Sequence, residues 1–262
     1  MSEEFTLDML DIPSSWRRGE GDWTGVAAAL AKGETVEVIQ EVGSTLWRNS
    51  LPEKHSLYWE GENLSTIKAR IWISFTQRRF SPESALPKVQ WHPRVLWVGI
   101  GCERYTAREL IETAIQNVCR ANHLAESAIA GIATIDTKAG EVGLLELCQE
   151  RNWPLKTFAA DILSSVEVPN PSNIAAKAVG TPSVAEAAAL CAIAQIVTAH
   201  KHKNTQIPIN HLSLSALRGG SHPLLVPKKI FRSQNPPPLQ GGVRGGSAVT
   251  VAVAVCPIDY LG

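Results

Sequence analysis

The residues best suited to chemistry fall in three short segments, and the first is Gly99-Ile-Gly-Cys-Glu-Arg-Tyr-Thr106. It lies between an apolar run and an amphipathic run, so we expect it to join a strand to a helix. Free backbone N–H groups and the helix dipole favour an anion at such a junction. The alternative is a tight turn alone, with Thr106 and Glu109 forming a capping box. The candidate ligand contacts in this segment are Gly99, Gly101, Cys102, Arg104 and Thr106.

The same segment argues against a dinucleotide site. The dinucleotide fingerprint needs a third glycine where this chain has Arg104, and no convincing ribose-binding acid follows a second strand. Nicotinamide and flavin cofactors are therefore not expected. We also expect that Cys102 is not a covalent nucleophile, because the adjacent Glu103 opposes the thiolate and no histidine is near in sequence.

The second segment, Asp136-Thr-Lys-Ala-Gly-Glu141, places three ionisable groups within six residues. It follows an apolar run typical of a strand, and α/β proteins bind ligands at the carboxyl ends of their strands. Glu141 is our first candidate for proton transfer, with Asp136 and Lys138 as substrate contacts. On spacing alone, a solvated turn and helix start is the favoured alternative.

The third segment, Val179-Gly-Thr-Pro-Ser-Val-Ala-Glu186, opens an Ala-rich apolar run. Its proline suits the first turn of a helix, and Thr181 or Ser183 can serve as the N-cap. Glu186 is our second candidate for proton transfer, and Gly180, Thr181 and Ser183 are candidate substrate contacts. Because Glu186 stands three residues after Ser183, a capping box also explains it without catalysis.

Alternating strand and helix patterns surround these three segments. This alternation predicts an α/β domain in which a mixed, mainly parallel sheet is flanked by helices. Because parallel strands end at one edge of a sheet, we predict that the three segments form one cleft there. The expected strands are 95–100, 129–135, 155–158, 223–230 and 249–255, and the expected helices are 107–122, 142–150, a short one after Asp161, and 184–198.

A smaller α/β unit is predicted over residues 1–91, with a helix at 23–31 and strands at 35–40 and 69–75. Three prolines between residues 82 and 93 separate two apolar runs and predict a linker, with the boundary near 88–92. The second domain then covers 92–262. Inside it, the Pro- and Gly-rich stretch 233–247 is expected to be a disordered insert between two strands.

Charge and composition exclude several classes of protein. The 262 residues include 25 basic and 25 acidic side chains, so no net field draws the chain to nucleic acid or to an anionic membrane. No apolar run is long enough to span a bilayer, and the acidic N-terminus is unlike a targeting peptide, so the cytoplasm is expected. Five scattered cysteines without a Cys-x-x-Cys pair disfavour disulfides and zinc. Neither a metal site nor a hydrolytic triad is predicted.

Together, the motif Gly99-Ile-Gly-Cys102, the run from Ala130 to Leu145 and the run from Val179 to Leu190 resemble one family. They are similar, in type and order, to the C-terminal domain of the cobalt-precorrin-5A hydrolases of cobalamin biosynthesis (CbiG), which the stand-alone CobE proteins share. The resemblance covers about 94–258. Residues 23–75 resemble the middle region of the same family, whereas its N-terminal domain has no counterpart here.

The resemblance implies hydrolysis of the ring δ-lactone of cobalt-precorrin-5A, with release of acetaldehyde to give cobalt-precorrin-5B. It implies no external cofactor, because cobalt arrives within a corrin substrate that bears several carboxylates. A separate N-terminal-domain subunit or neighbouring enzymes of the pathway are the implied partners. The alternative function is that of a non-catalytic corrinoid carrier resembling CobE, and a nucleotide-dependent enzyme is a weaker third candidate.

Overall fold

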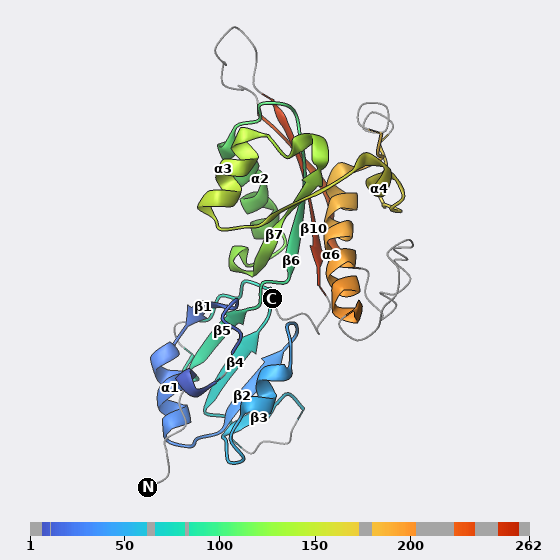
Figure 1. Cartoon of the computed structure of the whole chain (residues 1–262). Coiled ribbons are helices and arrows are strands. Elements are labelled where there is room, and N and C mark those ends of the chain that lie inside the picture. The colour runs from blue at the N-terminus through green and yellow to red at the C-terminus, as the bar shows by residue number, and fades with distance from the viewer. Residues whose placement is uncertain are drawn as a thin grey trace. The chain divides into compact units, whose positions relative to one another are not determined.

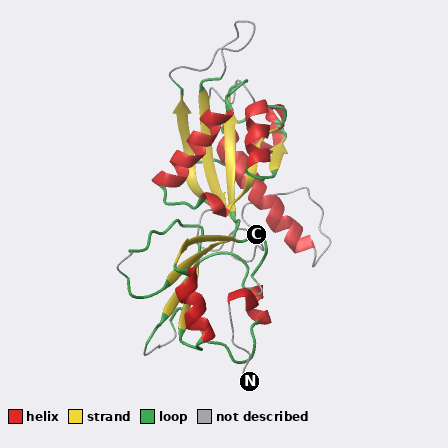
Figure 2. Cartoon of the chain, turned by 90° about the vertical axis from the view of Figure 1, so that its left-hand side faces the viewer, coloured by secondary structure: helices red, strands yellow, loops and turns green. Residues whose placement is uncertain are grey.

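The chain forms two compact units in a computed structural model, shown in Figures 1 and 2. The first unit contains the residues up to Val95 together with His123–Ala128, and the second contains Leu96–Asn122 and Ile129–Cys256. The structure describes residues 7–10, 12–61, 66–81, 84–172, 180–202, 223–233 and 246–256.

The first unit is built on a five-stranded sheet in the order β1-β5-β4-β2-β3. Strands β2, β3, β4 and β5 are parallel to one another, and the edge strand β1 is antiparallel to β5. Alternate residues of β4 are buried, which is the pattern of a strand with one face on a core. The strands are β1 (Arg17–Gly21), β2 (Val36–Gln40), β3 (Leu57–Trp59), β4 (Ala69–Ile73) and β5 (Lys88–His92), with short 3-10 turns at Leu7–Met9 and Leu46–Ser50.

Helix α1 (Trp23–Ala31) packs against this sheet through Val26, Ala29 and Leu30. Asp22 caps it by accepting a hydrogen bond from the backbone N–H of Gly25 at 2.8 Å. The helix was predicted at these residues. The boundary predicted near 88–92 instead lies within the buried strand β5, which pairs with both β4 and β1, and the first unit extends to Val95.

The second unit contains a five-stranded mixed sheet in the order β8-β7-β6-β10-β9. Strands β6, β7 and β8 are parallel, and β10 lies antiparallel between β6 and β9. All seven residues of β7 are buried, as expected for an inner parallel strand covered on both faces. The predicted mixed α/β fold is confirmed. The strands are β6 (Leu96–Cys102), β7 (Ile129–Ile135), β8 (Leu155–Phe158), β9 (Leu224–Arg232) and β10 (Ala248–Val255).

Helices cover both faces of this sheet, with α2 and α3 on one side and α6 on the other (Figure 1). Every residue of α6 from Ala185 to Ile193 is buried, which explains the Ala-rich sequence of this part of the helix. The insert predicted at 233–247 lies largely outside the described residues, which stop at Ser233 and resume at Gly246. The helices are α2 (Arg108–Ala121), α3 (Val142–Glu150), α4 (Ala160–Ser164) and α6 (Val184–His202).

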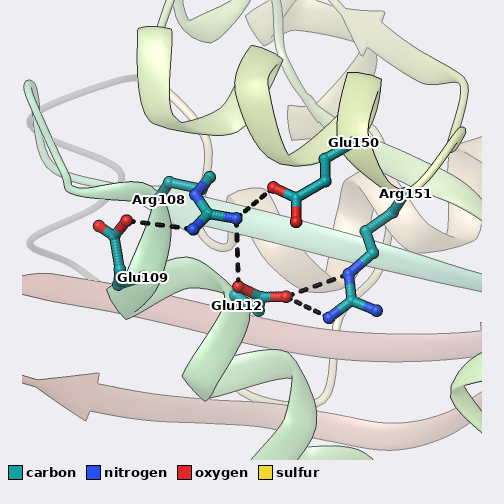
Figure 3. Close-up of polar contacts among 5 residues, drawn as sticks. All are labelled: Arg108, Glu109, Glu112, Glu150 and Arg151. Carbon is teal, nitrogen blue, oxygen red and sulfur yellow. Dashed lines mark hydrogen bonds and ion pairs between the residues drawn. The ribbon is translucent and has the colours of Figure 1, made fainter.

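A network of ion pairs joins α2 to α3 (Figure 3). Glu112 of α2 accepts hydrogen bonds from Arg108, at 3.5 Å, and from Nε of Arg151, at 3.0 Å, just beyond the end of α3. Arg108 also pairs with Glu150 and Glu109. Because one carboxylate serves two guanidinium groups, the network fixes the two helices against each other on the side of the sheet opposite α6.

Candidate functional site

The first two predicted segments meet at the edge of the second sheet where β6 ends at Cys102 and β7 ends at Ile135; we call this the carboxyl edge. The carboxylate of Glu141 accepts a hydrogen bond from the backbone N–H of Tyr105 at 2.8 Å. Its other oxygen accepts one from Nζ of Lys138 at 3.0 Å. Both side chains of this ion pair are nearly buried, at 11% and 12% exposure. Glu141 therefore ties the two loops together.

The backbones of these two loops also approach very closely. A Cβ atom at Gly143 would lie 2.4 Å from the carbonyl oxygen of Thr106, so only glycine fits in the first turn of α3. The capping box expected from Thr106 and Glu109 is wrong, since α2 has Ala107 at its N-cap and no side-chain cap. Instead, the Thr106 hydroxyl donates to the carbonyl of Glu103 at 2.8 Å.

The third segment reaches the carboxyl edge through the start of α6. A Cβ at Gly99 would lie 1.8 Å from the carbonyl oxygen of Ala185, and one at Gly101 would lie 3.5 Å from Cβ of Val184. Gly99 therefore allows the helix to pack directly against β6. The structure thus brings all three predicted segments to one edge of one sheet.

Two hydroxyl groups in the third segment are buried without a hydrogen-bond partner in the described chain. Thr181 is 0% exposed and Ser183 is 1% exposed. Leaving a buried hydroxyl unsatisfied costs about 1–3 kcal/mol. Ser183 directly precedes α6, but its side chain does not cap that helix, so the predicted capping box with Glu186 is wrong. The described chain therefore leaves both hydroxyls unsatisfied.

Glu186 is fully buried and is held by three neutral donors. Its carboxylate accepts hydrogen bonds from Nδ2 and the backbone N–H of Asn170, at 2.8 and 3.3 Å, and from the backbone N–H of Lys228 at 3.0 Å. A buried carboxylate needs such donors to offset its lost hydration. These contacts anchor α6 to β9 and to the chain before α6.

Cys102 lies at the end of β6, close to Lys138 and Glu141. Burial raises the pKa of its thiol to about 11, while Lys138 and a hydrogen bond with Thr106 act in the opposite direction. The nearby carboxylates of Glu141 and Glu103 raise the pKa further. At neutral pH this cysteine is therefore a thiol, and it lacks the thiolate that covalent catalysis requires.

The two residues just before β10, Gly246 and Ser247, also reach the carboxyl edge. The carboxylate of Glu103 accepts hydrogen bonds from the backbone N–H and the hydroxyl of Ser247, at 2.6 and 3.1 Å. The backbone N–H of Gly246 donates to the carbonyl of Tyr105 at 3.2 Å. Sequence reasoning missed Glu103 and Tyr105 as organising residues, because their partners lie far away along the chain.

The remaining predicted residues sit at the surface of this edge. Asp136 and Arg104 are exposed, and Gly180 is exposed with a left-handed φ of 75° that suits glycine. In the described part of the chain, no three His, Cys, Asp or Glu side chains cluster as metal ligands. Among the same residues, no helix is long and apolar enough to cross a membrane.

Two family models match the chain. The model described as cobalamin synthesis G C-terminus matches residues 96–254, and the one described as cobalamin biosynthesis central region matches residues 5–93. Together they account for both compact units.

Similar proteins include cobalt-precorrin-5A hydrolases from two bacteria. The Priestia megaterium protein is 26% identical over 181 residues, covering 67% of this chain and 48% of the relative. The Salmonella typhimurium LT2 protein is 31% identical over 154 residues, covering 58% and 42% respectively. The chain thus spans about half the length of these curated relatives. A solved structure of CobE, a protein from the cobalamin pathway, is 25% identical with a TM-score of 0.43, over 62% of this chain and 91% of CobE.

Proposed function

The chain belongs to the CbiG family of cobalamin biosynthesis, and from this premise we propose that it hydrolyses the ring δ-lactone of cobalt-precorrin-5A. The products of this proposed reaction are acetaldehyde and cobalt-precorrin-5B. The observation that carries the proposal is the meeting of all three family-like segments at the carboxyl edge, around the Lys138–Glu141 ion pair.

The proposed reaction has two steps. Water adds to the lactone carbonyl, and the ester C–O bond breaks to leave a carboxylate and an alcohol on the ring substituent. Loss of the alcohol proton then forms the carbonyl of acetaldehyde, and the electrons of the broken C–C bond pass to the ring. Both steps move protons, so they require a base and an acid but no oxidant or reductant.

Glu141 is our first candidate for this proton transfer. Its carboxylate is nearly buried and lies beside an ammonium group, so it is held in a defined position as a base must be. Lys138 is suited to polarising the lactone carbonyl or binding a ring carboxylate once substrate displaces part of the ion pair. Glu186 stays a second candidate, although its three donors favour an anchoring role.

The unpartnered hydroxyls of Thr181 and Ser183 support a substrate contact in the third segment. They stand at the N-terminus of the 19-residue helix α6, where the helix dipole favours a negative charge. A carboxylate of the ring would accept hydrogen bonds from the two hydroxyls and would supply the negative charge that the helix dipole favours. We propose Gly99, Gly101, Arg104, Thr106, Asp136 and Gly180 as further residues of the substrate-binding edge.

We further propose that the protein needs no resident cofactor, since the cobalt ion is part of the substrate. We also propose that the protein acts in the cytoplasm. Its proposed partners are a separate N-terminal-domain subunit or neighbouring enzymes of the pathway.

The test is to give the purified chain cobalt-precorrin-5A and to measure acetaldehyde with alcohol dehydrogenase and NADH. We expect acetaldehyde release, and a loss of at least about a hundredfold in kcat for Glu141→Gln. Glutamine retains an oxygen to accept the Tyr105 N–H, so the loop keeps its position. Glu146→Gln, at an exposed acid on α3, the helix that Glu141 directly precedes, is the matched control. Binding without acetaldehyde release would instead identify a carrier, and unchanged release by Glu141→Gln would remove Glu141 from the mechanism.

A further inference from the structure

Tyr105 has a left-handed backbone conformation, with a φ of 58° that residues other than glycine rarely adopt. Its backbone N–H and its backbone carbonyl both form hydrogen bonds with residues of other segments. Its N–H donates to Glu141 at the start of α3, and its carbonyl accepts from Gly246, just before β10. Contacts distant in sequence thus impose a conformation that the loop would not adopt by itself.

The effect of this conformation is to expose two side chains. Tyr105 is 57% exposed, and the neighbouring Arg104 is also exposed. Within the part of the chain that the structure describes, the Arg104 guanidinium forms no ion pair. Adjacent residues on a loop with a fixed backbone therefore carry an exposed aromatic ring and an exposed cation.

The surroundings leave this pair available for a ligand. The adjacent acid, Glu103, accepts both of its hydrogen bonds from Ser247. Val142 and Leu145, one turn apart on α3, are 64% and 43% exposed. The loop and the start of α3 are in contact, so apolar side chains extend the surface beside the Tyr105 loop.

We infer that Arg104 and Tyr105 recognise the corrin ring of the substrate. Tyr105 packs on a flat apolar face of the macrocycle, and Arg104 pairs with a carboxylate at its rim. An aromatic ring near a cation is complementary to a flat apolar ring system that carries carboxylates at its rim. The inference rests on the proposed function, since that function supplies the ligand. Glu141 is here a positioning residue as well, because it holds the backbone of Tyr105.

The test compares two probes that share the corrin ring but differ at its rim: dicyanocobyrinic acid carries free carboxylates, and its heptamethyl ester carries uncharged methyl esters in their place. Their equilibrium affinities for the whole chain are measured by absorbance titration. Tyr105→Ala should weaken binding of both probes by about tenfold or more, and Tyr105→Phe should bind both as the wild type does. Arg104→Gln should weaken binding of the acid by at least about fivefold and leave the ester unchanged.

A second variant separates recognition from folding. Tyr105→Gly accepts the left-handed φ without strain, so its Tm should not fall although its affinity falls as in Tyr105→Ala. A structural role for the ring would lower the Tm and the affinity together, and would overturn the inference. Tyr58→Ala, in β3 of the first unit, and Arg120→Gln, in the last turn of α2, are matched controls that should bind both probes normally.

The outcomes separate the two proposals. If the wild type binds the probes and the variants at Arg104 and Tyr105 bind equally well, the inference is wrong and the proposed function stands. If the wild type binds neither probe up to millimolar concentration, corrin recognition itself fails, and the inference fails with it.

Discussion

Single residues at the carboxyl edge differ in how far the sequence could reveal them. The Lys138–Glu141 pair is local, three residues apart, and was predicted as a cluster of ionisable groups. The hydrogen bond from Tyr105 to Glu141 spans 36 residues and has no sequence signal. Thr106 and Ser183 were assigned as helix caps because their spacing to a glutamate fits a capping box. The structure shows neither cap: the Thr106 hydroxyl donates to the carbonyl of Glu103, three residues earlier, and the Ser183 hydroxyl has no partner in the described chain.

His92 in the first unit provides a test of pH dependence. It is fully buried, its Nδ1 lies 2.8 Å from the carbonyl oxygen of Ser74, and its Nε2 has no hydrogen-bond partner in the described chain. Burial lowers its pKa, although the Ser74 carbonyl and Glu20 oppose the shift. The folded state therefore keeps His92 neutral below pH 6.5, where the unfolded chain binds a proton.

It follows that His92 lowers the free energy of unfolding as pH falls below about 6.5, by at most about 1.4 kcal/mol per pH unit. His92→Asn, whose amide can still donate to Ser74, should remove this part of the pH dependence between pH 6.5 and 5. Urea unfolding at several pH values measures it. His123→Asn, at an exposed left-handed position, is the control, and an equal slope in wild type and His92→Asn would contradict the prediction.

Cys102 should be dispensable for turnover. With a thiol pKa of about 11, roughly one molecule in a thousand carries a thiolate at pH 8. Cys102→Ala and Cys102→Ser should therefore release acetaldehyde within about tenfold of the wild-type rate, well above the loss expected for a catalytic group. Iodoacetamide at pH 7.5 should leave the activity intact. Loss of turnover in both variants with corrin binding retained would show that the prediction is wrong.

At the scale of elements, prediction worked where a strong local pattern met a buried environment. Strand β7 and helices α1 and α3 occur at the predicted residues, because their apolar patterns match their burial. Strand β8 also occurs as predicted, although only Phe158 in it is buried. Strands β1, β3 and β5 were missed for three different reasons. The sequence of β1 is polar and glycine-containing, β3 has only three residues, and β5 follows closely after prolines that indicated a linker.

The anchoring of α6 by Glu186 leads to an element-scale prediction. In Glu186→Gln, one carboxylate oxygen becomes an amide that faces a donor, so a buried N–H of Asn170 or Lys228 loses its acceptor. We expect a loss of about 1–3 kcal/mol and a fall in Tm of about 3–10 °C. The kcat of the folded fraction should change little.

Thermal unfolding followed by circular dichroism, together with the acetaldehyde assay, measures both quantities. Glu146→Gln, an exposed carboxylate on α3, is the control and should leave the Tm within about 1–2 °C of the wild type. Should Glu186→Gln keep the wild-type Tm but lose acetaldehyde release, Glu186 would be a catalytic residue and not an anchor.

At the scale of the whole molecule, the sequence predicted the mixed α/β fold but not the order of its strands. The last two strands were expected, yet nothing local to β10 indicates that it pairs with β6, about 150 residues earlier. Placing β10 beside β6 also brings Gly246 and Ser247 to the Tyr105 loop. The contacts of Gly246 and Ser247 with this loop, which the sequence did not predict, therefore depend on that long-range pairing.

The balance of charge over the whole chain predicts how the rate of association with the proposed ligand depends on salt concentration. With 25 basic and 25 acidic residues, the protein has no net charge that would attract a polyanion over a long distance. Attraction should therefore be confined to short-range ion pairs, such as the proposed pair between Arg104 and a carboxylate of the ligand. The association rate constant for dicyanocobyrinic acid should then fall less than about threefold between 50 and 500 mM NaCl, whereas the dissociation rate constant should rise as the local pair is screened. Stopped-flow absorbance measures both constants. A fall of tenfold or more in the association rate constant would reveal long-range steering and would contradict this prediction.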